Sequence, residues 1–168
     1  SRDYRIIYHK YFLSRRAPIR RQSDYFSLTG GRISIYDEII KRESKKIPWD
    51  WRLLASLIRT ESNFNPTARS WAGAYGLMQI MPGTFVHFGA SEQSTPEENI
   101  MAGVRYIKWL DRRFKESVPD SAERIKFILA SYNIGQGHID DAMRLAEKFG
   151  KDPSVWENSV SFYLYNKT

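Results

Sequence analysis

The stretch that decides the fold runs from Asp50 to Glu61 and reads Asp-Trp-Arg-Leu-Leu-Ala-Ser-Leu-Ile-Arg-Thr-Glu. Leu53, Leu57 and Glu61 fall at i, i+4 and i+8, which places all three on one face of a helix. Asp50 is a typical N-cap residue, and Pro66 limits the helix on its far side. The stretch therefore predicts an amphipathic helix whose last turn carries an acid on its apolar face.

Glu61 is also isolated in the sequence, since no other Asp or Glu follows it before Glu92. A carboxylate on an apolar face loses hydration, which raises its pKa toward neutrality and suits it to donate a proton as a general acid. A helical carboxylate can equally mark the place where an apolar face meets solvent. The helix alone leaves both interpretations open.

Helix signals continue on both sides of this stretch. The expected helices cover residues 34–46, 50–61, a short piece from 82, 96–114, 121–132 and 139–149. Ser34 and Asp37 form a candidate capping box, and Gly135 with Gly137 is expected to separate the last two helices. No segment alternates as a strand would, so the predicted fold class is all-α, with helices packed on one another.

The composition narrows the function only in part. A chain of 168 residues with 42% hydrophobic content suits one domain with a tail, and its net charge of +7 favours an anionic partner. Nucleic acid, a lipid surface and the bacterial cell wall are all anionic, so the charge does not choose among them. The absence of cysteine excludes disulfides and thiol chemistry, and the positions of His87 and His138 indicate neither a metal site nor a cofactor.

Residues 1–33 differ from the rest, because they mix aromatic and basic side chains before the break at Thr29-Gly30-Gly31. We expect this region to be a connector or the end of an upstream domain, with the main domain at 34–168, and the chain to be a piece of a longer protein. Nucleic-acid binding is not favoured, since nothing fixes the aromatic rings on a surface. The basic residues include Arg15, Arg16, Arg20 and Arg21.

Three short blocks combine residue types that helices built only for packing seldom need. They are Glu61-Ser-Asn-Phe-Asn-Pro66, Ser70-Trp-Ala-Gly-Ala-Tyr-Gly-Leu-Met-Gln-Ile-Met-Pro82 and Ala130-Ser-Tyr-Asn-Ile-Gly135. Glycines in the second block let the backbone approach a ligand, and Gln79 offers both a donor and an acceptor. Taken singly, the blocks also fit turn glycines, a core Met78 and a buried Tyr132.

Taken together, the blocks resemble the lytic transglycosylase domain of the goose-type lysozyme-like superfamily. The pattern is Glu-Ser, then Gly-Leu-Met-Gln, then Ala-x-Tyr-Asn-x-Gly, and the resemblance extends from about Trp49 to Trp156. The segments after Gly135 and before Trp156 are most similar to the membrane-bound lytic murein transglycosylase F group. This implies a lysozyme-like helical domain with a substrate groove, preceded by a periplasmic solute-binding-like domain. The family's last helix, beyond the Trp156 region, is expected to be missing here.

The resemblance also implies a reaction. Most glycosidases use two acids, but here the C6 hydroxyl of N-acetylmuramic acid would attack its own anomeric carbon and leave a 1,6-anhydro end. Glu61 would first protonate the glycosidic oxygen of the β-1,4 bond to N-acetylglucosamine and then accept the hydroxyl proton. The substrate-binding residues implied are Ser70, Tyr75, Met78, Gln79, Tyr132 and Asn133.

The same resemblance sets the expected surroundings of the protein. Its partner would be the glycan strands of peptidoglycan, on the periplasmic side of a Gram-negative envelope and associated with the outer membrane through the parent protein. We expect a monomer that needs no cofactor and no metal. Two alternatives stay open, a muramidase that hydrolyses the same bond and a non-catalytic module that only binds the wall.

Overall fold

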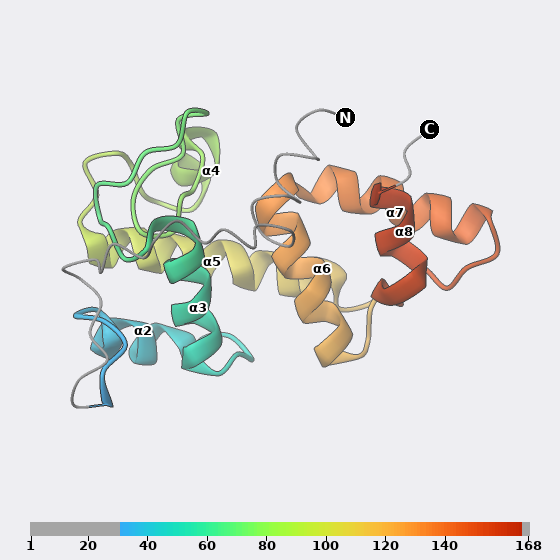
Figure 1. The fold of residues 1–168 in the computed structure, drawn as a ribbon, viewed down its shortest axis with the longest axis horizontal. Helices are drawn as coiled ribbons and strands as arrows, with labels where there is room; N and C mark the ends of the chain where they lie inside the picture. The colour runs from blue at the N-terminus through green and yellow to red at the C-terminus, as the bar shows by residue number, and fades with distance from the viewer. Residues whose placement is uncertain (1–30, 166–168) are drawn as a thin grey trace, which may run out of the picture. The chain divides into compact units, whose positions relative to one another are not determined.

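The computed structural model describes residues 31–165, and its described part is helical (Figure 1). The described part of the chain divides into two compact units, residues 31–108 and residues 109–165. Among these residues the extended pairing consists of two isolated bridges, which confirms the all-α class. The helices are α2 (Asp37–Ser44), α3 (Trp51–Ser62), α4 (Pro82–His87), α5 (Pro96–Phe114), α6 (Ser121–Ile134), α7 (Gln136–Lys148) and α8 (Ser161–Tyr165).

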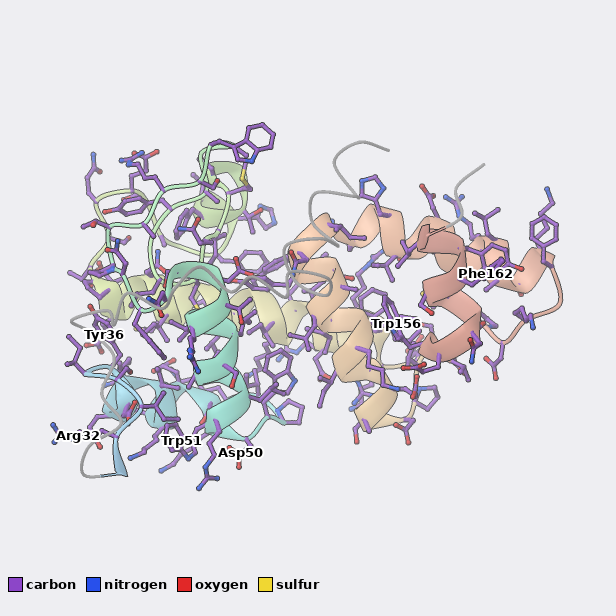
Figure 2. The ribbon with its side chains drawn as sticks, viewed as in Figure 1. Arg32, Tyr36, Asp50, Trp51, Trp156 and Phe162 are labelled. Atoms are coloured by element: carbon purple, nitrogen blue, oxygen red, sulfur yellow. The ribbon has the colours of Figure 1, made fainter. Side chains whose placement is uncertain are left out.

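The helix predicted first, α3, forms as its sequence indicates. Asp50 is its N-cap, and the carboxylate accepts a hydrogen bond of 2.7 Å from the backbone N–H of Arg52. Leu54, Leu57 and Ile58 are buried, so one face of the helix belongs to the core of the first unit. Figure 2 shows Asp50 at the end of the helix where the chain enters it.

The far end of α3 stops abruptly because two residues in succession adopt left-handed backbone. Asn63 has φ 52° and donates its N–H to the carbonyl of Arg59, while Phe64 has φ 62°. Asparagine tolerates this conformation, but a bulky phenylalanine in it is strained. Phe64 is fully buried, so the apolar surface it removes from water offsets that strain. The chain therefore turns sharply directly after Glu61 and Ser62.

The helix predicted at residue 34 begins later than expected. The Asp37 carboxylate accepts from the backbone N–H groups of Ile33 and Ser34, both at 2.9 Å, and from the Ser34 hydroxyl at 3.0 Å. These bonds close a turn ahead of α2, and Tyr36 rather than Ser34 is the N-cap. The expected pair of residues meets, but it shapes the entry to the helix instead of its first turn.

The longest helix, α5, has the limits that the sequence predicts. Thr95 and Glu98 form a capping box, in which the Thr95 hydroxyl accepts from the N–H of Glu98 and the Glu98 carboxylate accepts from the N–H of Thr95 at 2.7 Å. That backbone hydrogen bond is the main cause that lowers the pKa of Glu98. Within residues 31–165 no helix combines the length and the apolar character that a membrane span requires.

The second unit is held by aromatic packing and by one buried ion pair. The Phe127 ring lies 5.9 Å from that of Phe114 and 5.3 Å from that of Trp156, which Figure 2 shows beside α6. Arg124 is almost fully buried and donates to the Asp111 carboxylate at 2.8 Å and to the carbonyl of Val118 at 2.7 Å. The guanidinium thus has the partners that a buried charge requires.

One expectation about this unit is wrong, and one short helix was not expected. Gly135 alone, with φ 88°, separates α6 from α7, and Gly137 is helical, because a single left-handed residue is enough to redirect the chain. A short helix, α8, also follows Trp156, where the sequence predicted none. It packs against α7, and tertiary contact stabilises a segment whose own pattern is too short to signal a helix.

Gly103 of α5 is required by packing. A Cβ at this position would lie 2.4 Å from Cε and 2.8 Å from Cγ of Met78. We expect Gly103→Ala to lower the free energy of unfolding by about 1 to 3 kcal/mol, because the core would be overpacked. Gly137→Ala is the matched control, since nothing lies within 4 Å of its added Cβ, and it should raise stability by about 0.5 kcal/mol. Denaturant unfolding of the two variants measures both values, and equal effects would contradict the packing.

Candidate active site

Glu61 is the last residue but one of α3 and is half-buried. It continues the face that Leu57 and Ile58 bury, and it lies where that face reaches the loop after the helix. The predicted position at the end of an apolar stripe is therefore what the helix has. Partial burial suits a carboxyl group that must both hold a proton and reach a substrate. The raised pKa of Glu61 stays a prediction.

The residues that follow Glu61 fix the end of the helix and the turn after it. The Ser62 hydroxyl donates to the carbonyl of Ile58 at 3.1 Å, so this side chain supports the helix. The Asn65 side-chain oxygen accepts from both the N–H and the hydroxyl of Thr67, at 3.0 and 2.9 Å. The polar residues of the first block thus organise their own backbone.

Ser70 closes a small hairpin in the second block. Its N–H donates to the carbonyl of Ala74 at 2.9 Å, and its hydroxyl oxygen accepts from the N–H of Ala74 at 3.0 Å. Gly73, with φ 91°, allows the tight return of the chain. The hydroxyl proton of Ser70 is not used in these bonds and is available to donate.

Gln79 locks the loop that follows. Its amide nitrogen donates to the carbonyls of Ala68 and Gly76, at 3.0 and 2.9 Å, and its own backbone is left-handed, with φ 45°. Both amide protons hold the loop, so the side-chain oxygen is the atom that can accept from a ligand. The residue is half-buried, which leaves that role possible.

Tyr75 lies between two neighbouring segments of the loop. Isolated bridges pair it with Arg69 on one side and with Ile80 on the other, and its N–H donates to the carbonyl of Ile80 at 3.3 Å. The guanidinium carbon of Arg69 lies 4.7 Å from the centre of the Tyr75 ring, and Arg69 also pairs with Glu92 at 2.8 Å. Tyr75 is thus built into the loop framework and remains half-buried.

Met78 lies in the core. Its exposed fraction is 0%, and its side chain packs against Gly103 of α5. Direct contact with a substrate would require the core to open. Met78 thus packs in the core, and its expected role at the substrate stays a prediction.

Asn99 is a residue of this site that the sequence analysis missed. Its exposed fraction is 2%, its side-chain oxygen accepts from the N–H of Met78 at 2.8 Å, and its amide nitrogen donates to the carbonyl of Tyr75 at 3.3 Å. A Cβ on Gly76 would lie 2.2 Å from that nitrogen, so only glycine allows this approach. An amide and the small Gly103 one turn apart on a buried helix face were the signal that pointed to a backbone packed closely on α5.

Tyr132 and Asn133 occupy the last turn of α6, where both are half-buried. The preceding Ser131 is fully buried, and among the described residues its hydroxyl has no hydrogen-bond partner. These residues belong to the second unit, whereas Glu61 belongs to the first. Their predicted position near Glu61 stays a prediction.

The described part of the chain contains no cluster of metal-binding side chains. Over residues 31–165, no three side chains of the metal-binding types His, Cys, Asp and Glu come together in a group that could hold an ion.

Comparison with known proteins identifies the family. The family model described as transglycosylase SLT domain matches residues 38–155, which is most of the chain. The chain belongs to the transglycosylase SLT domain family. The match includes all three blocks and extends from the first unit into the second.

Curated relatives carry the name membrane-bound lytic murein transglycosylase F. The protein of Desulfosudis oleivorans is 38% identical over 127 residues, which are 76% of this chain and 28% of the relative. The protein of Haemophilus influenzae strain PittGG is 42% identical over 116 residues, 69% of this chain and 24% of the relative. The SLT domain chain thus spans about a quarter of the length of these relatives.

Solved structures support the fold. The X-ray structure of an inactive mutant of lytic transglycosylase Slt from Pseudomonas aeruginosa superposes with a TM-score of 0.52 at 29% identity, over 65% of this chain and 18% of that one. The 70 kDa soluble lytic transglycosylase of Escherichia coli gives 0.50 at 24% identity, over 71% of this chain and 25% of that one, and shows likeness of fold.

The contacts of Asn99 predict the effect of removing its side chain. Asn99→Ala would remove the hydrogen bonds to the Met78 N–H and the Tyr75 carbonyl, so we expect the free energy of unfolding to fall by roughly 1 to 3 kcal/mol. Gln93→Ala removes an exposed amide from the same unit and is the control, with a change near zero. Urea unfolding of both variants measures the difference, and a small loss for Asn99→Ala would show that the loop is not held this way.

Proposed function

We propose that this SLT domain is a lytic transglycosylase of peptidoglycan, and that Glu61 is its catalytic acid and base. The observation that carries the proposal is the half-buried carboxyl group at the end of α3, directly before the loop that Ser70, Gln79 and Asn99 hold in place. Relatives that share the domain are named lytic murein transglycosylases, and a similar structure is that of an inactive mutant in which glutamine replaces a glutamate.

The proposed substrate is the β-1,4 bond from N-acetylmuramic acid to N-acetylglucosamine. Glu61 donates its proton to the glycosidic oxygen as the bond from that oxygen to the anomeric carbon breaks. The C6 hydroxyl oxygen of the same muramic acid then bonds to the anomeric carbon, and its proton passes to the Glu61 carboxylate. The acid is regenerated and no water is consumed, so the product ends in a 1,6-anhydro ring.

This scheme fits a sequence in which no Asp or Glu follows Glu61 before Glu92. The next carboxylate along the sequence, Glu92, pairs with Arg69 at 2.8 Å. A glycosidase that uses an enzymic nucleophile or an activated water needs a second carboxyl group at the bond. An attacking hydroxyl supplied by the sugar removes that need.

The remaining site residues are proposed to hold the glycan in position. Ser70 and Gln79 offer a hydroxyl proton and an amide oxygen, while Tyr75 and Met78 support the loop from within. By the resemblance, Tyr132 would help to orient Glu61 or stabilise developing charge, and Asn133 would fix its own loop. We place the reaction on the periplasmic side of a Gram-negative envelope, with outer-membrane association through the parent protein and a monomeric domain.

Substitution of the proposed acid is the direct test. Glu61→Gln keeps the shape of the side chain but cannot donate a carboxyl proton, so release of soluble muropeptides from purified sacculi should fall by roughly a factor of a thousand. Glu116→Gln, at an exposed glutamate of the second unit, is the control and should match the parent. Binding of Glu61→Gln to sacculi in a pelleting assay should persist.

Mass spectrometry of the products separates the remaining functions. Anhydro ends support the lytic reaction, whereas reducing ends, heavier by one water, would establish a muramidase. A Glu61→Gln variant as active as the parent would remove Glu61 from the mechanism. Pelleting without any soluble product from the parent chain would establish a binding module.

The positive charge of the chain lies largely outside the described residues. Residues 31–165 contain 18 basic and 17 acidic side chains, so nearly all of the net charge of +7 lies in residues 1–30 and 166–168. Any electrostatic attraction to anionic wall polymer therefore depends mainly on the basic residues near the N-terminus, which include Arg15, Arg16, Arg20 and Arg21.

A salt titration tests that dependence. Pelleting of the parent with sacculi should weaken between about 0.05 and 0.5 M salt, because the screening length shortens. Replacing the four arginines, Arg15, Arg16, Arg20 and Arg21, by glutamine should remove most of the slope. Equal pelleting of the parent at both salt concentrations would show that charge does not contribute.

A further inference from the structure

Trp71 is the most unusual exposed residue of the first unit. Its exposed fraction is 89%, although tryptophan is one of the side chains that gain most from burial. It lies in the second block of the sequence, between Ser70 and Gly73. Among the described residues, no aromatic ring and no cation stacks on its indole.

The backbone that carries Trp71 is held firmly. The Ser70 N–H donates to the carbonyl of Ala74, and the Ser70 hydroxyl accepts from the N–H of Ala74. The N–H of Gly73 donates to the carbonyl of Ser70 at 3.1 Å, and the bridge between Arg69 and Tyr75 pairs the two ends of the hairpin. An exposed ring on a hydrogen-bonded hairpin loses little further freedom when a ligand covers it. The indole is therefore exposed on an ordered support.

The surroundings of the ring leave it open. Ala72 is small, and a Cβ on Gly73 would find no atom within 4 Å, so neither following residue walls the indole. The indole N–H is a polar donor at the edge of the ring, and Ser70, whose hydroxyl accepts from the N–H of Ala74, is the preceding residue of the hairpin. A flat apolar face bordered by donors suits the apolar face of a pyranose ring, which carries its hydroxyl groups around the rim.

We propose that Trp71 is a substrate-binding residue that stacks on one sugar ring of an N-acetylated β-1,4 glycan strand. The inference rests on the proposed function, because Tyr75 joins this hairpin directly to the loop that Gln79 locks. The ring acts as a fixed platform next to the polar loop. It adds binding energy along the strand and takes no part in the transfer of protons.

Two other exposed apolar residues favour a different occupant. The register of Tyr75 with Ile80 places Met81 opposite Ala74. Met81 is exposed, and so is Val86 of α4, whose exposed fraction is 78%. A lipid surface would use all of these residues together. Residues 31–165 are nearly balanced in charge, so any attraction to anionic lipid would come from residues 1–30 and not from the residues around Trp71, whereas a glycan needs only the single ring and its donor. The glycan is therefore the occupant that the observations support.

The test compares Trp71→Ala and Trp71→Phe with Val86→Ala, at another exposed apolar residue of the same unit. The first probe is a hexamer of β-1,4-linked N-acetylglucosamine, and binding is measured by calorimetry. Trp71→Ala should weaken affinity about tenfold, the usual effect of losing a tryptophan at the centre of a contact. Trp71→Phe should recover part of it, and Val86→Ala should bind as the parent does. Thermal unfolding should be the same for all, because Trp71 is exposed.

Activity on soluble glycan strands separates this inference from the proposed reaction. Trp71→Ala should raise KM about tenfold and leave kcat near that of the parent, since the ring binds substrate without reacting. A parent that forms anhydro products while Trp71→Ala keeps its KM and its hexamer affinity would overturn the platform and leave the reaction standing. A parent that forms no product but loses hexamer affinity on Trp71→Ala would overturn the reaction alone.

Vesicles of phosphatidylglycerol test the lipid surface. The glycan platform predicts that sedimentation with vesicles is equal for the parent, Trp71→Ala and Val86→Ala. Vesicle binding that both substitutions abolish, together with unchanged hexamer affinity, would overturn the inference in favour of membrane contact.

Discussion

The first unit depends on one contact, in which the Asn99 side-chain amide hydrogen-bonds the backbone of the loop at Tyr75 and Met78. Burying an amide on an apolar helix face is unfavourable unless its donor and acceptor are both satisfied. Here the Met78 N–H and the Tyr75 carbonyl satisfy them, at 2.8 and 3.3 Å. Glycine on the loop and Gly103 on α5 let the two surfaces approach closely enough for those bonds to form.

The loop held in this way gives the candidate site its order. The Gln79 side chain hydrogen-bonds the carbonyl of Ala68 and so connects the same loop to that segment. The hairpin of Ser70 is joined to the loop at Tyr75, which pairs with both Arg69 and Ile80. Side chains that position a substrate act efficiently only when they are fixed before it binds. Ser70 and Gln79 hold backbone with one atom each, and the remaining hydroxyl proton and amide oxygen are the atoms that the proposed glycan contact would use.

Glu61 depends on a different local device. The left-handed residues Asn63 and Phe64 end α3 directly after it, so the carboxyl group lies where an apolar helix face gives way to the loop. The buried Phe64 ring holds that strained turn in place. Strain of this kind is kept where the surrounding structure fixes it, and it often accompanies function. The half-buried acid, the ordered loop and the exposed Trp71 are thus consequences of how one helix ends and how one loop packs.

The sequence by itself determined the helices and the position of the acid, because the signals lie within a turn or two of each other. Asp50 caps α3 and Thr95 caps α5 through bonds to neighbouring backbone, and the spacing from Leu57 placed Glu61 at the edge of the buried face. Only the tertiary structure decided that Met78 is core and that Asn99 is part of the site. Those roles arise where a loop meets a helix more than twenty residues later, and no local pattern records which backbone groups will meet there.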